Sequence, residues 1–389
     1  MSKPRILIAM ITVGNGHKAP ADALKAGIDK LYPDRFDVDV LDFTAEVGDT
    51  EFDKRHKESW NWMLENPQFA YWGQILLDTL VPVQATRFVQ GRILKRHAKN
   101  AAYFVNRKRY DLIVATHFFT IQAIAMAKER FGVTVPLVGV NTDPFDAHVM
   151  WAEPDVDEMI VSSAVARDKL VKKLVPPEKV SVFGYPLGLQ FLEHHPKAYA
   201  RGELGLDPDM LTVVQSAGGE GIGGQLEGFV RAVLEADLPV QYVVACGRNT
   251  KLTHYLAEIA ERYPHSKTKF IPKGFISNMQ TWLAASDLVL GKAGAATTFE
   301  ALVVGRPIFH TSYVAYNEKT NIDWCIEQGV GKYLPKPDQL VDTLRDFLAH
   351  PADLEKLQKK VQNLGIEVGT LQIAQHLAET YFAETSPRD

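Results

Sequence analysis

Short apolar runs alternate with amphipathic segments along most of the chain. The first run, RILIAMIT at residues 5–12, is continuous, as in a strand buried on both faces of a sheet. The segment from Ala19 to Leu31 has apolar residues at helical spacing and predicts a helix after that strand. Further short runs predict strands at 36–43, 111–115, 135–140, 159–161 and 180–183, and then at 211–215, 241–246, 270–271, 287–290 and 308–309. Strands that alternate with helices form parallel sheets, so the predicted fold class is α/β with two doubly wound units.

The break between the two series of strands defines the expected domains. Residues 187–210 contain prolines, glycines and the adjacent pair His194-His195, which lacks metal partners at useful spacing, and we interpret them as a connection. The 389 residues suffice for two cores, since a single core stops growing at about 250 to 300 residues. We therefore predict an N-terminal domain over 1–190, a C-terminal domain over 205–365, and a final helix within 366–389 that packs back on the N-terminal domain.

The stretch from Asp287 to Phe309, DLVLGKAGAATTFEALVVGRPIF, predicts a strand, a loop at Gly294-Ala295-Ala296, a helix opened by Thr297, and a second strand. Ligands of open parallel sheets bind outside the carboxyl ends of strands, where a helix N-terminus offers free N–H groups to a phosphate. Glu300, one turn into the helix, is placed to reach a ribose diol. Turns of this kind also occur for structural reasons alone. This unit by itself therefore does not decide whether the chain binds a nucleotide.

A second loop suited to phosphate follows the strand at 211–215. Five of the nine residues from Ser216 to Gly224 are glycine, including Gly218, Gly219 and Gly221. Glycines let backbone N–H groups approach a phosphate closely. The loop is not a P-loop, because no Gly-Lys-Ser/Thr follows it, and it does not match G-x-G-x-x-G.

Two polar residues of the first half follow predicted strands and are candidates for acid–base chemistry. His17 lies where a glycine turn meets a helix N-terminus, which favours the neutral, proton-accepting form of its ring. Asp143 follows the strand at 135–140, where a loop can point it into the ligand crevice. The structural alternatives stay open: His17 as a capping or surface residue, and Asp143 as a turn residue before Pro144.

The alternation of strands and helices breaks between residues 51 and 109, where the composition is helical. Aromatic and leucine side chains come first, and eight cations without one carboxylate follow between residues 79 and 110. Such a segment suits an anionic membrane surface, at about 1 kcal/mol per cation. The alternative is a core aromatic cluster beside a solvated basic helix. A nucleic-acid groove would use similar residues, but no nucleic-acid motif is present, so no nucleic-acid partner is expected.

Composition indicates a soluble globular protein, with 46% hydrophobic and 23% charged residues. No apolar run approaches the roughly 18 to 20 residues of a membrane-spanning helix, and the N-terminus has no signal-peptide layout. The formal charge of −4 excludes a globally basic nucleic-acid binder. Cys246 and Cys325 have neither disulfide nor metal-ligand spacing. We expect a cytoplasmic protein with reduced thiols.

Taken together, the motifs resemble a known group of enzymes. The Gly-x-Gly-His at 14–17, and the Thr-Asp-Pro at 142–144 with His148 and Trp151 downstream, resemble the glycosyltransferases that make monogalactosyl- or glucosyl-diacylglycerol. The stretch 287–309 is similar to the sugar-nucleotide signature that this group shares with the MurG-type glycosyltransferases. The resemblance covers nearly the whole chain in the same order.

The resemblance implies a GT-B architecture, in which two Rossmann-like domains face each other across a cleft. The C-terminal domain would bind a UDP-sugar, and the N-terminal domain would bind diacylglycerol or a glycolipid at the anionic inner face of the cell membrane. The reaction would invert the anomeric centre without a metal, and with no cofactor besides the donor substrate. His17 would deprotonate the acceptor hydroxyl, with Asp143 assisting or orienting.

The resemblance also assigns binding residues, with Phe275 at the uracil, Glu300 at the ribose and the small-residue loops at the diphosphate. The donor-binding residues would be Gly218, Gly219, Gly221, Phe275, Gly294, Ala295, Ala296, Thr297, Glu300, Asn317, Glu318 and Asn321. The acceptor and membrane residues would be Gly16, His148, Trp151, Trp60, Trp62, Arg92, Lys95 and Arg96.

Two departures from the family pattern concern the donor. At 316–321, in a predicted loop after the strand at 308–309, this chain has Tyr-Asn-Glu-Lys-Thr-Asn where the relatives usually have Gly-Gln-Glu-x-x-Asn. Ala295 replaces a common second glycine. The shorter amide of Asn317 leaves the donor hexose unidentified. Two other functions are compatible with the same fold: a non-hydrolysing UDP-sugar epimerase, which needs no membrane-facing segment, and a non-catalytic sugar-nucleotide sensor.

Overall fold

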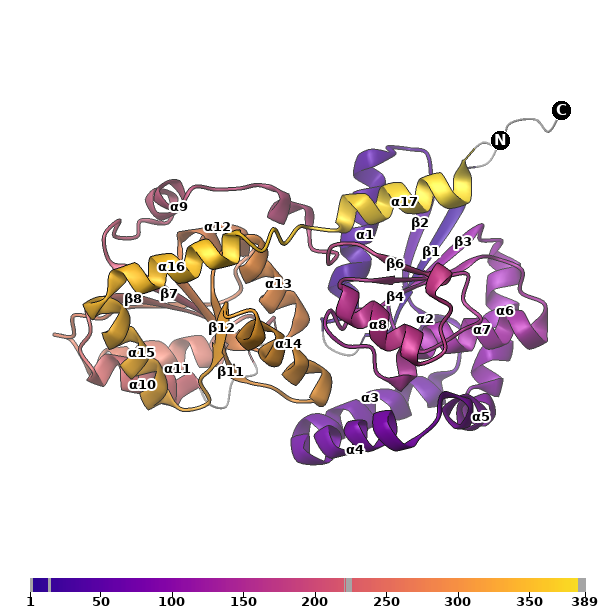
Figure 1. Cartoon of the computed structure of the whole chain (residues 1–389), viewed down its shortest axis with the longest axis horizontal. Coiled ribbons are helices and arrows are strands. Elements are labelled where there is room, and N and C mark those ends of the chain that lie inside the picture. The colour runs from indigo at the N-terminus through magenta and orange to yellow at the C-terminus, as the bar shows by residue number, and fades with distance from the viewer. Residues whose placement is uncertain (1–2, 13–14, 220, 222–225, 384–389) are drawn as a thin grey trace. The chain divides into compact units, whose positions relative to one another are not determined.

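The computed structural model describes residues 3–12, 15–219, 221 and 226–383. The chain forms two compact units, of which the first comprises residues 1–189, 314–317 and 368–389, and the second residues 190–313 and 318–367. In the described part of the chain each unit contains one six-stranded sheet with parallel strand pairs (Figure 1). Two doubly wound α/β units confirm the predicted fold class.

The sheet of the first unit has the strand order β2-β1-β3-β4-β5-β6. Its strands are β1 (Arg5–Met10), β2 (Asp37–Asp42), β3 (Leu112–Ala115), β4 (Leu137–Val140), β5 (Glu158–Val161) and β6 (Val180–Val182). In β1, Ile6, Ile8 and Met10 pack into one core, while Leu7 and Ala9 pack into the core on the opposite face. Both faces are covered, which is why this strand is continuously apolar.

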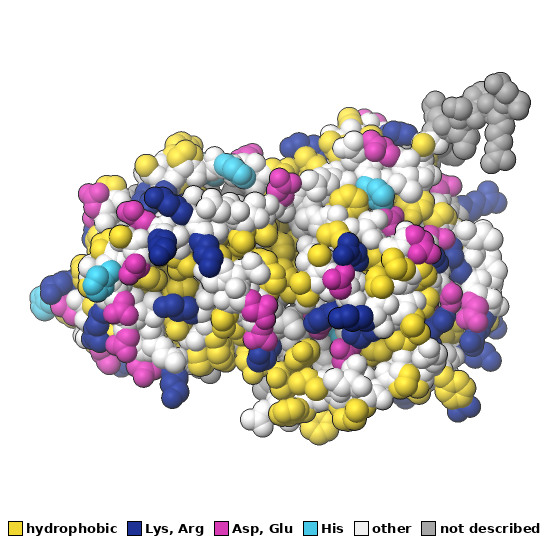
Figure 2. Space-filling view, in the orientation of Figure 1, with side chains coloured by type: hydrophobic (Ala, Val, Ile, Leu, Met, Phe, Trp, Pro, Cys, Tyr) yellow, Lys and Arg dark blue, Asp and Glu magenta, His cyan; other side chains and the backbone are white. Residues whose placement is uncertain are grey.

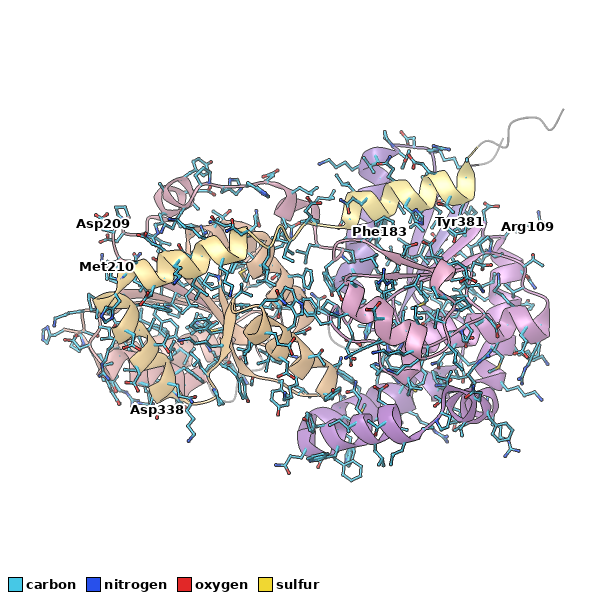
Figure 3. All side chains as sticks on the ribbon, in the orientation of Figure 1. Arg109, Phe183, Asp209, Met210, Asp338 and Tyr381 are labelled. Atoms are coloured by element: carbon cyan, nitrogen blue, oxygen red, sulfur yellow. The ribbon has the colours of Figure 1, made fainter. Side chains whose placement is uncertain are left out.

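Helices cover the two faces of this sheet. One face carries α1 (Lys18–Leu31) and α17 (Thr370–Phe382), and the other α6 (Lys95–Lys108), α7 (Phe118–Phe131) and α8 (Ala164–Lys172). The C-terminal helix α17 packs so closely on α1 that a Cβ at Gly27 would lie 2.8 Å from Cγ2 of Thr370. Farther along α17, His376 Nε2 lies 2.7 Å from Oε1 of Glu158. Tyr381 comes from the same helix (Figure 3), and its hydroxyl donates to Oε2 of Glu158 at 3.2 Å.

Four helices lie between β2 and α6 in the chain: α2 (Phe43–Glu46), α3 (Thr50–Glu65), α4 (Pro67–Leu80) and α5 (Val83–Ile93). Asp49 caps α3 by accepting a hydrogen bond from the N–H of Phe52. Short 3-10 helices follow at η1 (Val149–Trp151), η2 (Pro177–Lys179) and η3 (Leu189–Leu192). The predicted helical insertion at 51–109 is therefore confirmed as a set of helices.

The sheet of the second unit has the order β12-β11-β10-β7-β8-β9. Its strands are β7 (Leu211–Ser216), β8 (Val240–Ala245), β9 (Lys269–Lys273), β10 (Leu288–Lys292), β11 (Ile308–Ser312) and β12 (Gly331–Tyr333). Its helices are α9 (Lys197–Leu204), α10 (Leu226–Glu235), α11 (Thr250–Ala260), α12 (Met279–Ala285), α13 (Ala295–Val303), α15 (Pro337–Ala349) and α16 (Pro351–Gln362), and α14 (Tyr316–Glu327) starts at the boundary of the units. Counted from β7, this is the strand order of dinucleotide-binding folds.

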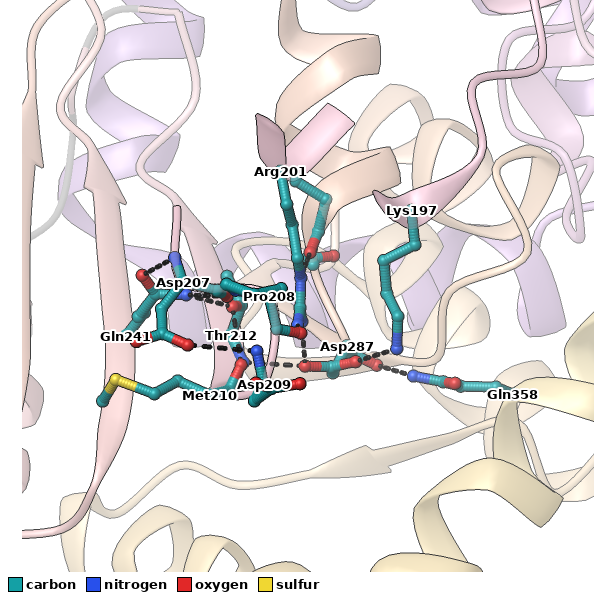
Figure 4. A network of polar contacts seen from close by, with 12 residues as sticks. Lys197, Arg201, Asp207, Pro208, Asp209, Met210, Thr212, Gln241, Asp287 and Gln358 are labelled. Carbon is teal, nitrogen blue, oxygen red and sulfur yellow. Dashed lines mark hydrogen bonds and ion pairs between the residues drawn. The ribbon is translucent and has the colours of Figure 1, made fainter. Parts of the chain in front are cut away.

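A buried carboxylate, Asp287, joins several elements of the second unit (Figure 4). It accepts hydrogen bonds from Arg201 at 2.6 Å and from the N–H of Thr212 at 2.8 Å, and it pairs with Lys197 at 2.8 Å. Gln358 donates to its backbone carbonyl at 2.8 Å. Burial raises the pKa of this carboxyl, but Lys197, Arg201 and Thr212 outweigh burial, so the pKa is lowered. Asp287 thus ties α9 and α16 to the start of β10 and to β7.

Three boundaries predicted from the sequence are wrong. Helix α13 begins at Ala295, so Ala295 and Ala296 are helical, as suits the residue with the highest helix propensity. Residues 316–321, expected as a loop, form the first turns of α14. The connection at 187–210 contains η3 and α9, and α9 is fixed to the second unit by Lys197 and Arg201.

Candidate active site

Three neighbouring strands of the first unit end in the polar residues of the candidate site. His17 follows β1, Thr116 and His117 follow β3, and Thr142 and Asp143 follow β4. Because β3 pairs with both β1 and β4, the carboxyl ends of these strands lie side by side. The strand order also reverses beside β1, which is where open parallel sheets bind ligands.

His17 is held in one orientation. Its Nδ1 lies 2.7 Å from the carbonyl oxygen of Thr116, the hydroxyl of Thr142 lies 3.0 Å from the same nitrogen, and the Thr116 hydroxyl donates to the His17 carbonyl at 3.0 Å. A carbonyl only accepts, so Nδ1 carries the proton and Nε2 keeps its lone pair. Burial lowers the pKa of His17 and outweighs the negative charge of Asp143 and the bond to Thr116, which raise it. At neutral pH the ring is therefore a neutral proton acceptor.

Asp143 is surrounded by hydrogen-bond donors. Its Oδ2 accepts from the indole N–H of Trp151 at 2.7 Å and lies 3.5 Å from Nε2 of His148, and its Oδ1 accepts from the amide of Asn317 at 2.7 Å. Burial raises the pKa of the carboxyl, but His148, Asn317 and Trp151 outweigh burial and lower it. A carboxylate stabilised by several donors is a weak base. Asp143 is thus an anion that places a fixed negative charge in the site and orients the side chains that contact it.

The residues predicted to meet the acceptor or membrane lie in different places. Trp151 is fully buried and holds Asp143, so it does not face a membrane surface, and its predicted contact with the acceptor stays a prediction. His148 is also buried, at the start of η1, where its Nδ1 accepts from the N–H of Met150. Gly16 is exposed in the turn before His17.

Aromatic rings around His17 were missed by sequence reasoning. The ring of His117 lies 4.4 Å from that of His17 and 5.2 Å from that of His56 on α3. Burial lowers the pKa of His56 to about 4 and that of His117 well below its ordinary value. These rings therefore form an uncharged wall. His117 directly follows a strand, and that position was the available signal; His56 lies inside a helix and carried none.

A pocket of about 730 Å³ opens beside these residues. Its polar end includes His17, Asp143 and His148, and much of the remainder is lined by side chains of α3 and α4, among them Trp60 and Leu77. A pocket of this volume holds a ligand of ordinary small-molecule size. The arrangement can accommodate a molecule with an apolar body and a hydroxyl group next to His17.

Hydrophobic side chains also gather on the outside of α3 and α4 (Figure 2). Trp72 is 67% exposed and Leu80 is 70% exposed, and Trp62 is also exposed, so the alternative of an aromatic core cluster is wrong for these residues. Exposed apolar patches of this kind mark interaction surfaces. The predicted cations Arg92, Lys95 and Arg96 are exposed on α5 and α6, and Arg96 also lines the pocket.

In the second unit the two loops predicted to bind the donor start at the same edge of the sheet. β7 and β10 are neighbours, with Ser216 opposite Gly291, and the strand order reverses between them. Gly218 and Gly221 have φ angles of 75° and 66°, a region that favours glycine. Residues 220 and 222–224 of this predicted loop lie outside the described residues, as do residues 13–14 of the turn before His17.

Arg248, which sequence reasoning did not select, connects two predicted donor residues. Its N–H donates to the carbonyl of Gly219 at 2.9 Å, and its guanidinium lies 5.1 Å from the ring centre of Phe275. Phe275 is 60% exposed, so its ring remains accessible to a ligand. The available signal was the position of Arg248, in the turn directly after β8.

The N-terminus of α13 lies at the end of β10. Gly294 is its N-cap and no side chain caps it, while Ala295, Ala296 and Thr297 are half-buried in its first turn. Such a terminus offers N–H groups to an anion. Glu300 is half-buried one turn further on, and burial raises its pKa to about 7.

Asn317, Glu318 and Asn321 lie in the first turns of α14 but have different environments. Asn317 donates to Asp143, and Glu318 forms an ion pair with Lys292, which follows Gly291 at the end of β10 and was not predicted. Asn321 is 2% exposed and donates to the carbonyl of Ala293 at 2.8 Å. Its buried amide therefore supports the loop before α13, and its role in donor binding stays a prediction.

Within the described ranges, no helix is both long and apolar enough to cross a membrane. The same residues contain no group of three or more His, Cys, Asp or Glu side chains placed to hold a metal ion. Cys246 and Cys325 are buried free thiols.

Each half of the chain is similar to a known protein family. Residues 17–187 match the family described as monogalactosyldiacylglycerol (MGDG) synthase, and residues 230–380 match the glycosyltransferase family 28 C-terminal domain. The chain is 29% identical over 373 residues to the chloroplastic monogalactosyldiacylglycerol synthase of Spinacia oleracea, covering 93% of this chain and 69% of that protein. It is 26% identical over 367 residues to monogalactosyldiacylglycerol synthase 1 of Arabidopsis thaliana, covering 90% of this chain and 66% of that protein.

Solved structures show the same fold. Acinetobacter baumannii MurG aligns with a TM-score of 0.62 at 12% identity, covering 97% of this chain and 98% of MurG. Anabaena Alr3699/HepE in complex with UDP aligns with a TM-score of 0.53 at 16% identity, covering 97% of this chain and 99% of that protein. The sequence comparisons indicate that the chain is a glycosyltransferase, and the solved structures show its GT-B fold. It is similar to monogalactosyldiacylglycerol synthases over nearly its whole length, and residues 230–380 also match the glycosyltransferase family 28 C-terminal domain.

Proposed function

We propose that this glycosyltransferase moves a hexose from a UDP-sugar to diacylglycerol or a glycolipid at an anionic membrane surface, inverting the anomeric centre without a metal. The observation that carries the proposal is the pocket of about 730 Å³, which is lined by His17 and Asp143 and by several apolar side chains of α3 and α4. Such a pocket suits an acceptor that combines one reactive hydroxyl with long apolar chains. A water-soluble sugar acceptor would leave the apolar lining without a partner.

In the proposed reaction His17 is the general base. Its Nε2 takes the proton of the acceptor hydroxyl as that oxygen bonds to the anomeric carbon of the donor. The bond from this carbon to the diphosphate oxygen breaks, and UDP leaves with the electron pair. Attack from the face opposite the leaving group inverts the anomeric centre. General base catalysis of this kind contributes about 10²- to 10⁴-fold.

Asp143 then acts as an electrostatic and orienting residue. Its carboxylate is held anionic by Trp151, His148 and Asn317, so it competes poorly with His17 for the acceptor proton. Its negative charge stabilises the imidazolium that forms when His17 takes up the proton.

The donor is proposed to bind in the second unit. The N-terminus of α13 and the glycines at 218, 219 and 221 would face the diphosphate, whose growing charge they stabilise without a cation from solution. Lys292 adds a positive side chain at the end of β10. Glu300 would bind the ribose, Phe275 the uracil, and Asn317 with Glu318 the sugar. The UDP bound to Alr3699/HepE supports a nucleotide donor for this fold.

Membrane attachment is proposed to use the outer faces of α4 and α5 and the start of α6. Their exposed apolar residues would enter the headgroup region, and Arg92, Lys95 and Arg96 would meet anionic lipid at about 1 kcal/mol each. The protein would then act from the cytoplasm on the inner face of the cell membrane, where the diacylglycerol hydroxyl lies at the headgroup level.

Mass spectrometry of lipids tests this function. The protein is incubated with anionic phospholipid vesicles containing diacylglycerol and, separately, UDP-glucose, UDP-galactose or UDP-N-acetylglucosamine. A lipid that gains one hexose, lost in His17→Ala and kept in the exposed control His254→Ala, supports the proposal and identifies the donor. If the lipids stay unchanged while the UDP-sugar is epimerised, the protein is an epimerase. Nucleotide binding with no turnover would favour the sensor.

A further inference from the structure

Asp78, near the end of α4, makes two contacts with distant segments of the first unit. Its Oδ1 accepts a hydrogen bond from the backbone N–H of Val149 at 2.6 Å, 71 residues away in sequence. Its Oδ2 lies 3.3 Å from Nζ of Lys173, which follows α8. The Asp78 side chain is 17% exposed, and a hydrogen bond between a carboxylate and an N–H is among the stronger ones in proteins.

Val149 belongs to the short segment that holds Asp143. Helix η1 begins after His148 and ends at Trp151, and the N–H of Trp151 donates to the carbonyl of His148 at 2.9 Å. The side chains of His148 and Trp151 both approach Oδ2 of Asp143. A shift of η1 therefore moves two of the donors that keep this carboxylate in place.

The other side of α4 is the proposed membrane surface. Leu76 is 57% exposed and Leu80 is 70% exposed, on either side of Asp78 in sequence. Asp78 is therefore attached to η1 while its neighbours remain available to a lipid surface.

Helix α5 makes a second connection to the same segment. The amide of Gln90, which is 7% exposed, lies 3.1 Å from the sulfur of Met150. Gln122 on α7 donates to the backbone carbonyl of Met150. Gln122 of α7 thus fixes the segment 148–151 to the core of the first unit. Asp78 of α4 and Gln90 of α5 connect the same segment to two helices that expose apolar side chains.

We propose that Asp78 is a positioning residue that couples docking of α4 on a lipid surface to the placement of Asp143, so that the enzyme is activated when it binds a membrane. The inference rests on the proposed function, because it needs α4 to meet lipid. When α4 is fixed by the bilayer, the bond from Asp78 holds η1, and His148 and Trp151 then hold Asp143 against His17. The lipid-free protein already forms these bonds, and a bilayer that restrains α4 would hold η1 more firmly through Asp78.

The chain offers a matched control for this residue. Asp157 makes the same two kinds of contact: it accepts from the backbone N–H of Leu137 at 2.6 Å and from Lys128 at 2.9 Å. It lies at the opposite end of β4 from Asp143 and contacts no residue of the site. Asp78→Ala is therefore compared with Asp157→Ala, and Asp78→Asn, which keeps an oxygen for the Val149 N–H, serves as the conservative variant.

Kinetics measure the coupling as the stimulation by vesicles. This stimulation is the kcat on anionic vesicles containing diacylglycerol divided by the kcat on short-chain diacylglycerol below its micelle concentration. We expect the wild type and Asp157→Ala to be stimulated by vesicles. In Asp78→Ala we expect kcat on vesicles to fall on the order of 100-fold and the stimulation to disappear. The KM for the UDP-sugar should stay within about twofold of that of the wild type. Asp78→Asn should retain most of the stimulation. An Asp78→Ala enzyme that keeps the vesicle stimulation of the wild type would overturn the inference.

Hydrogen exchange tests the link without turnover. In the wild type, diacylglycerol-free anionic vesicles should slow amide exchange in residues 148–151, and in Asp78→Ala the slowing should vanish while vesicle binding persists. Unchanged exchange in the wild type on vesicle binding would refute the coupling. If the wild type transfers no sugar to lipid, the proposed function fails, and this exchange result alone decides whether Asp78 couples the two segments.

Discussion

The imidazole of His17 and the backbone carbonyl of Thr116 lie 2.7 Å apart, across the loops that follow two adjacent strands. Because Nδ1 then carries the proton, Nε2 keeps its lone pair, and the His17 side chain lines the pocket. Since the acceptor is a main-chain carbonyl, no side-chain substitution at residue 116 can remove it. The basicity of the site is therefore built into the ends of β1 and β3.

The pH dependence of sugar transfer follows from His17. Its pKa lies below the ordinary value of 6.5, and its active form is the neutral ring. The rate should therefore be flat between about pH 7 and 8 and fall only as the pH drops below about 6.5. Asp143→Asn removes the charge that raises the pKa of His17, so its slower reaction should lose activity at a lower pH than the wild type. An acid limb above pH 7, or one that moves upward in Asp143→Asn, would contradict His17 as the base. The measurement is kcat/KM against pH.

Trp151→Phe tests whether the buried indole holds Asp143. The substitution removes one N–H from a carboxylate and leaves the ring volume nearly filled. We expect about 1.5 to 3 kcal/mol of lost stability, as for a hydrogen bond to a charged group. We also expect the rate of sugar transfer to fall by about tenfold, since the placement of Asp143 loosens. Trp282→Phe, at another buried tryptophan, is the control and should leave the rate unchanged.

The exposed leucines of α4 should determine membrane affinity. Leu76→Ser with Leu80→Ser removes two side chains that would be buried in lipid, each worth about 1.5 to 3 kcal/mol when fully buried. Binding to anionic vesicles in a flotation assay should weaken by at least about tenfold, while the melting temperature stays the same. Leu31→Ser, at an exposed leucine of α1, should bind vesicles like the wild type. Equal binding by all three proteins would exclude α4 from the membrane contact.

Asp287 should dominate the stability of the second unit. Asp287→Ala leaves Arg201, whose side chain is 4% exposed, without its carboxylate, and we expect a loss of about 3 to 5 kcal/mol. The pKa of Asp287 is lowered in the folded protein, so its contribution is present above the ordinary value of 3.8 and is lost as the pH falls below it. Urea unfolding at pH 7 and at about pH 2.5 should show a smaller gap between variant and wild type in acid. Asp207→Ala, which removes an exposed partner of Lys269, should change stability far less.

His97 should make the first unit sensitive to acid. It is fully buried on α6, 4.9 Å from the ring of Phe52, and burial lowers its pKa to about 4. Between pH 6.5 and 4 the unfolded chain binds a proton that the folded one does not, so stability falls as the pH falls. His97→Leu should remove up to about 3 kcal/mol of this dependence. His254→Leu, at an exposed histidine, should leave the slope of unfolding free energy against pH unchanged.

Local pattern was enough to predict the architecture and the positions of several candidate residues. The continuous apolar run at β1 is a direct consequence of burial on both faces, and alternating strands and helices force parallel sheets. His17, Asp143, Gly294 and Glu300 could be selected because each follows a strand within a few residues, and the carboxyl ends of parallel strands meet at one edge. The strand ends that precede these residues in the sequence are also their neighbours in space, and this is why local pattern sufficed to select them.

The sequence by itself determined the two doubly wound units and the helical character of 51–109, because periodicity and composition are local properties. Only the tertiary structure decided the partners: Trp151 with Asp143, His56 with His117, and Asp78 with Val149. Each of these pairs depends on how a loop or an amphipathic helix packs against the sheet, and periodicity indicates which face of a helix is apolar but not which residue it will meet. The burial of Trp151 and Asn321 could not be predicted for that reason, since it is imposed by segments far away in the chain.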